Sequence, residues 1–367
     1  MARTKRICFF SVGFAFNRLI RMRFYEKIFP KDVEIFLYTT DKYDGTSEEK
    51  YTSKWDLKRT KIFKTKYHPL KTLFNFRKFC KKNYIDAVSN LGHPFGGIPL
   101  IFESIGKKTK VLLYYLGDAI DYPKIDTFSK KGLISFFSLI PYWFLTKFSD
   151  KIATVAYNTY KKSPLFFLSR TNKFHYIHAT VNTDLFISIN KKLARKKIGI
   201  LNEEKVILFV GKITRRKGGK LLRQVIESNP DIKFILIGKW LEKEIPRFNF
   251  KNITVIDKVL NEKLNYSYSA ADLSFAYHLQ GCQMGIVGAE SLSCGTPILH
   301  TKRVAFPDSS AILRFNDDIN EINRKIKEFF ALSEKEREAL KKEARKYAIK
   351  YLSDDTWKEK YLNFFLE

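Results

Sequence analysis

The sequence predicts an α/β protein built from two doubly wound parallel sheets. Short apolar runs alternate with helical patterns along the chain, and strands that alternate with helices form parallel sheets with helices on both faces. The length of 367 residues exceeds that of a typical single hydrophobic core. The strand pattern also lapses once, over the polar, lysine-rich residues 182–197. These observations together predict two domains.

The first series of elements begins directly after the basic residues 1–6. A first strand explains this start better than a secretory signal peptide, because the apolar stretch is short and is interrupted by Gly13 and Asn17. Helical patterns over stretches such as 70–82 and 131–148 separate the strands. We expect those strands at residues 7–12, 33–38, 87–89, 110–115 and 151–156.

The second series follows the lapse and ends in a helical tail. Residues 333–352 carry Leu340, Ala344 and Ala348 at helical spacing, and residues 356–366 carry three aromatic side chains on one face. We expect domains at 1–185 and 186–350, followed by a C-terminal segment at 351–367 that docks on a domain. The strands of this series are expected at residues 206–210, 234–237, 253–256, 273–277 and 297–300.

The net charge of +29 narrows the set of partners. A positive field attracts nucleic acid, anionic membrane or phosphorylated small molecules. The alternative is a surface that is rich in lysine because the whole proteome is. No helix-turn-helix, zinc-finger or RNA-recognition signature is visible, so nucleic acid is not the expected partner, although the charge keeps a nucleic-acid-binding protein as a rival.

The cysteines and the longest apolar stretch indicate the cellular compartment in which the protein is expected. The four cysteines lie far apart without a Cys-x-x-Cys pair, and the six histidines show no metal-ligand spacing, which suits a reducing cytoplasm. The longest apolar stretch, 132–145, is too short to span a bilayer. It fits a core helix or an interfacial membrane anchor, because four lysines flank it: Lys130, Lys131, Lys147 and Lys151.

The stretch from Val206 to Gly218 predicts an anion site. An apolar, β-branched run ends at Gly211, two cations follow at Lys212 and Lys217, and a helical pattern begins at once. Backbone N–H groups at a helix start favour negative charge, and lysines add full charges to that partial one. The expected guest is a phosphate or pyrophosphate, and the competing interpretation is an ordinary solvated lysine surface. Neither a Walker loop nor a dinucleotide glycine turn is present.

Residues 277–300 form a second informative stretch. A strand leads into a turn with Gly285, and a short helix of small residues carries Glu290 before Gly295 and Pro297 end it. Gly285 lets backbone approach a phosphate or sugar closely. Glu290 is suited to accept hydrogen bonds from a diol. A surface glutamate is the alternative, but the small neighbours of Glu290 disfavour a free surface.

Together these stretches resemble the family 4 glycosyltransferases, which are retaining nucleotide-sugar enzymes with the GT-B fold. Gly211-Lys212-Ile213 and Lys217-Gly218 are similar to the family element whose two cations hold the donor diphosphate. Residues 285–297, beginning Gly285-Ile286-Val287, are similar to the segment whose glutamate, here Glu290, binds the donor ribose. The resemblance implies two Rossmann-like domains that face each other across a cleft.

Softer matches agree with this resemblance. Residues 149–155 look like the strand before the hinge, and residues 179–186 look loosely like the linker. The loop at 256–259 is similar to the one that touches the base, so Val259 is a donor-binding candidate. Trp357 looks like the aromatic residue of a tail helix that crosses back, which implies that 351–367 docks on the N-terminal domain.

Three departures from the family pattern stand out. Cys282 occupies the place of the first family glutamate, which contacts the transferred sugar. Tyr115-Leu-Gly-Asp118 lies where many members carry a histidine, and Gly13 stands alone where many carry paired glycines. A sugar-nucleotide-binding pseudoenzyme is therefore the second alternative.

The resemblance implies transfer of a hexose-like sugar, with retention, from a nucleoside diphosphate to a glycan or lipid-linked acceptor. Lys212 and Lys217 would neutralise the leaving diphosphate. No Asp-x-Asp pair is present, so we expect neither a metal nor another cofactor. Asp118 is expected as a base or orienting residue, and acceptor contacts are expected at Gly13, Asn17, Arg18 and His93.

Clusters of basic residues indicate the expected cellular location of the protein. We expect a cytoplasmic protein, with possible attachment to the inner face of an anionic membrane. Phe74, Phe76 and Phe79 lie beside one cluster, and either dip into the interface or pack in the core. The clusters are Arg18, Arg21 and Arg23, and Lys78, Lys81 and Lys82.

Overall fold

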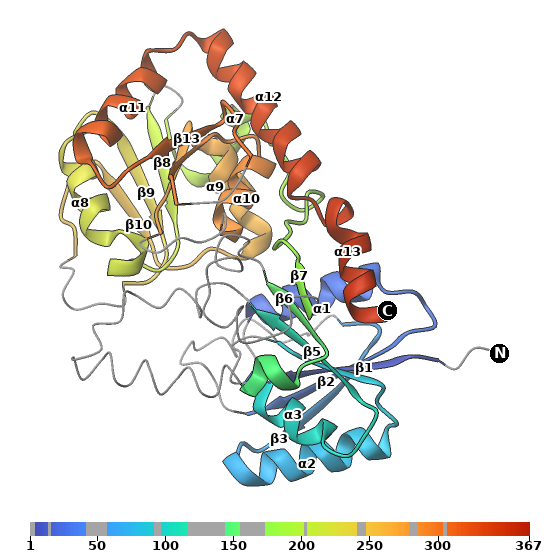
Figure 1. Ribbon diagram of the computed structural model, residues 1–367. Coiled ribbons are helices and arrows are strands. Elements are labelled where there is room, and N and C mark those ends of the chain that lie inside the picture. The colour runs from blue at the N-terminus through green and yellow to red at the C-terminus, as the bar shows by residue number, and fades with distance from the viewer. Residues whose placement is uncertain are drawn as a thin grey trace. The chain divides into compact units, whose positions relative to one another are not determined.

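The structure of the protein is a computed structural model, and its contacts divide the chain into two compact units. Unit 1 comprises Met1–Ile177 and Lys358–Glu367, and unit 2 comprises His178–Trp357. Each unit holds one parallel sheet between helices (Figure 1). The structure describes residues 4–13, 16–41, 57–91, 97–115, 144–154, 173–201, 204–240, 247–278, 285–303 and 307–367.

The sheet of unit 1 has seven parallel strands in the order β3-β2-β1-β4-β5-β6-β7. Its order confirms the doubly wound pattern, with β1 near the centre. β3 and β7 were not expected from the sequence. The strands are β1 (Arg6–Ser11), β2 (Glu34–Thr40), β3 (Thr60–Thr65), β4 (Ala87–Asn90), β5 (Lys110–Tyr115), β6 (Lys151–Thr154) and β7 (Phe174–Tyr176), and the helices are α1 (Phe16–Ile28), α2 (Pro69–Lys82) and α3 (Ile98–Ser104).

Side chains of β1 build a core on each face of this sheet, because successive residues of a strand point to opposite faces. Phe9 packs against Tyr25 of α1, with ring centroids 4.5 Å apart. Phe10 packs on the other face against Phe76 of α2, at 4.9 Å. Both phenylalanines are buried, so β1 is covered by helices on its two sides.

Helix α2 shows how its phenylalanines are used. His68 caps its start, since its Nδ1 accepts from the Lys71 N–H, and Pro69 occupies the first turn. Phe76 and Phe79 are buried in the core, which confirms the core interpretation for these two. Phe74 is 61% exposed and is not part of that core.

A tyrosine in a left-handed conformation ends α2. Tyr84 has φ 52, and its N–H donates to the Lys81 carbonyl, while the Ile85 N–H donates to the Cys80 carbonyl. These two bonds are those of a Schellman motif, in which the left-handed position usually belongs to glycine. The tyrosine side chain is 67% exposed, so core packing does not compensate the conformational strain.

The last turns of the chain pack on unit 1, the placement that the resemblance implies. Helix α13 (Asp354–Leu366) places Phe365 edge-on against Phe9, with centroids 5.4 Å apart. The Tyr361 hydroxyl lies 2.7 Å from the Tyr114 hydroxyl. Trp357 instead belongs to unit 2, where its Nε1 donates to the Tyr351 carbonyl.

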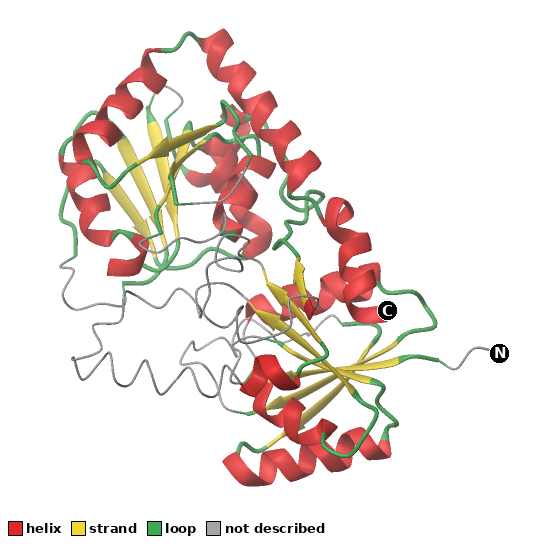
Figure 2. Cartoon of the chain, in the orientation of Figure 1, coloured by secondary structure: helices red, strands yellow, loops and turns green. Residues whose placement is uncertain are grey.

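The sheet of unit 2 has six parallel strands in the order β10-β9-β8-β11-β12-β13. A buried hydrophobic cluster covers each face of this sheet. Alternate residues of β8 belong to different clusters: Val206 and Leu208 to one, and Ile207 and Phe209 to the other. Figure 2 shows the helices that flank this sheet. The strands are β8 (Val206–Val210), β9 (Lys233–Ile237), β10 (Ile253–Ile256), β11 (Leu273–Ala276), β12 (Ile298–Thr301) and β13 (Ile312–Phe315), and the helices are α7 (Lys191–Ile198), α8 (Gly219–Glu227), α9 (Leu264–Ala270), α10 (Ile286–Ser293), α11 (Ile319–Ala331) and α12 (Glu334–Tyr351).

The lysine-rich segment before β8, where the strand pattern lapses, contains a helix. This helix is α7, where buried Arg195 donates to the Ala270 carbonyl and pairs with Asp272 at 3.0 Å. Upstream of it, the Val181 N–H donates to the Leu352 carbonyl, which ties this stretch to the end of α12. The contacts therefore divide the chain after residue 177, whereas the sequence predicts the boundary after residue 185.

Replacement of Tyr84 by glycine is expected to stabilise the protein. Glycine adopts the left-handed conformation without a Cβ penalty, so the free energy of unfolding rises by about 1 kcal/mol. Chemical denaturation followed by circular dichroism measures the change. Asn83→Gly is the control, because Asn83 has φ −97 and its side chain donates to the Phe79 carbonyl. Asn83→Gly should destabilise, and a lower midpoint for Tyr84→Gly would contradict the explanation.

Candidate functional site

The turn after β8 depends on glycines that let the backbone pass close to neighbouring groups. The Gly211 N–H donates to the Ile237 carbonyl at 2.8 Å. At Gly238, which has φ 145, a Cβ would overlap the Gly211 carbonyl oxygen. The turns after β8 and β9 therefore pack directly on each other.

A short 3₁₀ turn, Arg215–Lys217, then directs the chain toward the end of β11. The Thr214 hydroxyl accepts from the Lys217 N–H at 3.2 Å and caps this turn. Gly218 has φ 73, and a Cβ there would lie 2.5 Å from Cγ of Tyr277. Only glycine permits this approach, which brings the turn against the residue that follows β11.

Lys217 contacts a histidine for which the sequence reasoning assigned no role. Its Nζ lies 3.1 Å from Nδ1 and 3.2 Å from Nε2 of His278. Lys217 is half-buried. The two distances are nearly equal, so the amine lies close to both nitrogens of the ring.

His278 also lies beside the start of α10. A Cβ on Gly285 would be 3.1 Å from its Nε2. Gly285 is the N-cap of α10, and no side chain in the described part of the chain caps this helix. The first N–H groups of a helix have no partner within it and favour an anion. The structure thus brings the predicted Lys217 and Gly285 together, with His278 between them.

This arrangement occupies a topological switch point. The strands β8 and β11 are neighbours in the sheet. The chain leaves β8 toward α8, which contributes Leu222 and Val225 to one core cluster. It leaves β11 toward α10, which contributes Ala289 and Leu292 to the cluster on the other face. Ligands of open α/β sheets bind where the chain diverges in this way, beyond the carboxyl ends of the strands.

A second histidine, His300, packs against the ring of His278. His300 of β12 stacks on His278, with centroids 5.7 Å apart and ring planes at 9°. Burial lowers the pKa of His300 to about 3, against the hydrogen bond with the Thr301 carbonyl. His300 is therefore neutral and adds no charge beneath His278.

A guanidinium adds positive charge at the same edge of the sheet. Arg303, which follows β12, donates to the His278 carbonyl at 3.3 Å and to Asp317 at 3.0 Å. The Tyr277 hydroxyl donates to the same carboxylate at 3.0 Å. The sequence reasoning missed Arg303, because its position beside β11 follows only from the strand order.

Glu290 faces the interior of unit 2. Its side chain is buried, and its Oε2 accepts from the Tyr268 hydroxyl of α9 at 2.8 Å. Burial raises the pKa of Glu290 to about 8, although the hydrogen bond from Tyr268 acts in the opposite direction. The alternative of a surface glutamate is therefore wrong. Val259 and Val287 pack against the cluster that contains Tyr268, so these three donor candidates share one side of the sheet.

The remaining predicted residues are not joined to this group. Lys212 is exposed, and Ile286 is 45% exposed on the first turn of α10. In unit 1, the Gly13 N–H donates to the Thr40 hydroxyl at 3.1 Å. Arg18 donates to the Ser11 hydroxyl and the Val12 carbonyl at 2.9 Å, so it braces the turn after β1. Outside the described residues lie His93, Asp118, Cys282 and, for its side chain, Asn17.

The described residues show neither a candidate metal site nor a helix that could span a membrane. They contain no group of three His, Cys, Asp or Glu side chains that could hold a metal ion. Among them, no helix has both the length and the apolar character needed to cross a membrane.

Comparison with known proteins finds a family match within unit 2. Residues 190–347 match the profile described as Glycosyl transferases group 1. The chain is 27% identical over 134 residues to D-inositol 3-phosphate glycosyltransferase of Mycobacteroides abscessus, and 24% identical over 139 residues to that of Mycolicibacterium smegmatis. These matches cover 34% and 35% of this chain, and 30% and 32% of those proteins. The chain thus matches about a third of the length of these curated relatives.

Solved structures show the fold of the whole chain. Sucrose-phosphate synthase from Thermosynechococcus elongatus is similar with a TM-score of 0.75 at 16% identity, over 98% of both chains. HepE of Anabaena in complex with UDP-glucose is similar with a TM-score of 0.75 at 12% identity, also over 98% of both chains. These similarities confirm the predicted GT-B fold, and the profile match confirms the resemblance stated from the sequence.

The buried Glu290 predicts a pH-dependent stability. In the unfolded chain a glutamate ionises near pH 4.5, whereas in the folded chain Glu290 keeps its proton up to about pH 8. Between these values the native state binds the extra proton, so the free energy of unfolding falls as the pH rises.

Glu290→Gln removes this titration while keeping an acceptor for Tyr268. Its stability relative to the wild type should grow from pH 5 to pH 8 by on the order of a few kcal/mol. Denaturant unfolding across this range measures the difference, with the exposed Glu359→Gln as control. A difference that does not vary with pH would contradict the assigned burial of a protonated carboxyl.

Proposed function

We propose that this chain, in which residues 190–347 form a group 1 glycosyl transferase domain on the GT-B fold, is a glycosyltransferase that uses a nucleotide-sugar donor. The observation that carries the proposal is the convergence of Lys217, His278 and the start of α10, which no described side chain caps, at the switch point between β8 and β11. A cation beside free helix N–H groups suits a diphosphate. The same residues lie within the matched family domain.

The proposed reaction breaks the bond between the anomeric carbon of the sugar and a diphosphate oxygen. A hydroxyl oxygen of the acceptor bonds to that carbon and releases its proton, while the nucleoside diphosphate leaves with the bonding electron pair. Negative charge therefore grows on the leaving diphosphate, where Lys217 and the first N–H groups of α10 would stabilise it. Lys212, exposed on the same turn, would add a second charge.

The ribose and the base of the donor would contact residues on the face of the sheet that α10 covers. Glu290 would bind the ribose, and the Glu290 carboxyl with its raised pKa can donate one hydrogen bond as well as accept. Val259 and Val287 would contact the base and adjoining parts of the donor. UDP-glucose is the ligand of the similar HepE structure, which supports a uridine or related nucleotide here.

We further propose a glycan or lipid-linked acceptor, retention of configuration and a cytoplasmic protein. Gly13, Asn17, Arg18 and His93 are the acceptor candidates, with Asp118 as base or orienting residue. The basic and partly apolar surface of α2, with exposed Phe74 and Leu70, supports attachment to an anionic membrane face. Anomeric analysis of the product by NMR tests retention.

Loss of the Lys217 charge is expected to weaken transfer strongly. Lys217→Ala should lower kcat/KM by about 10²- to 10³-fold, because a preorganised charge at a leaving group contributes on this scale. Transfer and donor hydrolysis are measured with UDP- and GDP-sugars. Lys220→Ala on the adjacent α8 is the matched control, since Lys220 is exposed and lies in the next turn.

Wild-type rates for a folded Lys217→Ala protein would refute the donor site. Donor binding by the wild type without turnover on any acceptor would instead favour the pseudoenzyme that Cys282 suggests.

Metal removal is expected to leave transfer unchanged. The proposed mechanism uses protein cations where other transferases use a divalent ion. Activity is compared before and after dialysis against EDTA, with magnesium added back as control. A loss that magnesium restores would contradict metal independence.

A further inference from the structure

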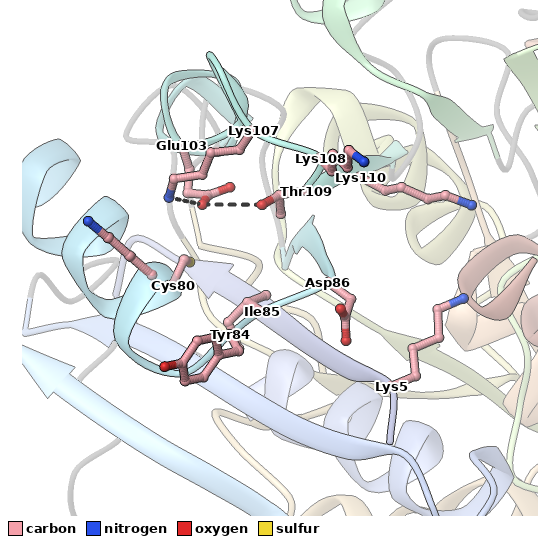
Figure 3. Close-up of a pocket in the computed structure, with 11 residues that line it drawn as sticks. Lys5, Cys80, Tyr84, Ile85, Asp86, Glu103, Lys107, Lys108, Thr109 and Lys110 are labelled. Atoms are coloured by element: carbon pink, nitrogen blue, oxygen red, sulfur yellow. Dashed lines mark hydrogen bonds and ion pairs between the residues drawn. The ribbon is translucent and has the colours of Figure 1, made fainter. Parts of the chain in front are cut away.

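A pocket of about 590 Å³ opens at the amino ends of the central strands of unit 1. Lys5 directly precedes β1, Asp86 directly precedes β4, and Lys110 begins β5. Figure 3 shows Tyr84, Ile85 and Asp86 along one side of it. Glu103, Lys107 and Thr109 face them from the end of α3 and the segment that follows.

This pocket is remote from the acceptor candidates Gly13 and Arg18 of the same unit. Gly13 and Arg18 lie beyond the carboxyl end of β1, whereas Lys5 lies before its amino end. The strand has 6 residues, so about 20 Å of strand separates the two edges. Strand β4 runs parallel to β1, and β5 runs parallel to β4. The amino ends of all three strands therefore lie together, and the pocket is at the end of the sheet opposite Gly13 and Arg18.

The lining of the pocket carries more positive than negative charge. Its carboxylates are Asp86 and Glu103, and the latter is already paired with Lys107 at 2.6 Å. Lys81 and Lys108 are exposed and form no ion pair within the described residues. Five lysines line it: Lys5, Lys81, Lys107, Lys108 and Lys110.

The half-buried Lys5 is repelled by the positive charges of neighbouring lysines. Burial lowers the pKa of Lys5, and the charges of Lys110 and Lys151 lower it further, whereas Asp86 and Glu367 raise it. An anion in the pocket would relieve this repulsion, because opposite charges close to an amine favour its protonated form. Cys80, Ile85 and the Tyr84 ring add apolar surface to the lining.

Tyr84 is the second indication that the pocket is used. It holds the strained left-handed position at the end of α2, where glycine would be accommodated without strain. Its ring is exposed and lines the pocket. Strain that packing does not compensate is concentrated at functional sites, and an exposed aromatic face stacks well on a sugar or an apolar chain.

We propose that this pocket binds the phosphate group of a second ligand, with the lysines around the phosphate and Tyr84 against the adjoining sugar or apolar part. The site is separate from the donor site and lies beyond the proposed function. A soluble phosphorylated compound and a phospholipid headgroup offer the same chemistry, so the test separates these two sources.

The test titrates inorganic pyrophosphate into the full chain by calorimetry at low salt. The wild type should bind at two classes of site. Lys81→Glu/Lys108→Glu should lose one class, with binding weakened roughly tenfold or more, because charge-assisted contacts are replaced by repulsion. Lys217→Ala should lose the other class.

The matched control is Lys327→Glu/Lys335→Glu, which changes the net charge equally at exposed positions of unit 2. Unchanged binding in the pocket variant, or an equal loss in the control, would overturn the proposal. Tyr84→Gly should keep pyrophosphate binding at the pocket while Tm rises, because pyrophosphate has no sugar or apolar part for the ring to contact. A loss confined to Lys217→Ala would leave the donor site standing and refute the pocket.

Flotation with vesicles identifies the source of the phosphate. Phosphatidylcholine vesicles with and without phosphatidic acid are compared for the wild type, the pocket variant and the control. Flotation that needs both phosphatidic acid and the two lysines supports a headgroup. Pyrophosphate binding without such flotation supports a soluble ligand, and failure of both arms refutes the site.

Discussion

The candidate site depends on the close packing of the turn after β8 against the end of β11. Gly218 has no side chain, and the Tyr277 ring occupies the space that a Cβ would need. This packing places Lys217 against His278, and His278 in turn lies against Gly285. A cation, two stacked imidazoles and a helix start thereby meet at one edge of the sheet. The backbone geometry determines the electrostatics of the site, because the turn positions the charge of Lys217.

Part of the unusual net charge has a structural task. Lys5 donates to the Leu366 carbonyl, Lys110 donates to the Glu367 carbonyl at 2.8 Å, and Lys151 donates to the Asn363 carbonyl at 3.0 Å. The last carbonyls of a helix lack partners and carry partial negative charge, so lysines stabilise them. The lysines at the amino edge of the first sheet thus hold α13 in place and also give the neighbouring pocket its charge.

The central strands of both sheets were predictable, whereas three of the four edge strands, β3, β7 and β13, were not. β1 and β8 are buried on both faces and show as continuous apolar runs. β3 is exposed at four of its six positions and β7 is only half-buried, so neither shows such a run. No helix was expected at lysine-rich α7, because its buried Arg195 is satisfied by Asp272 and Ala270, which lie far along the chain.

By itself, the sequence determined the fold class, the glycine- and lysine-bearing turn at Gly211–Gly218 and the helix that begins after Gly285, because each of these has a local pattern of apolar, glycine and charged residues. Only the tertiary structure decided which groups meet. His278 joins Lys217 across 61 positions of sequence, and Glu290 meets Tyr268 across 22. Such pairs arise from strand order and helix packing, and residues so far apart leave no periodic signal in a single sequence. The strained Tyr84 is likewise evident only from its backbone angle, since the sequence there shows an ordinary polar turn.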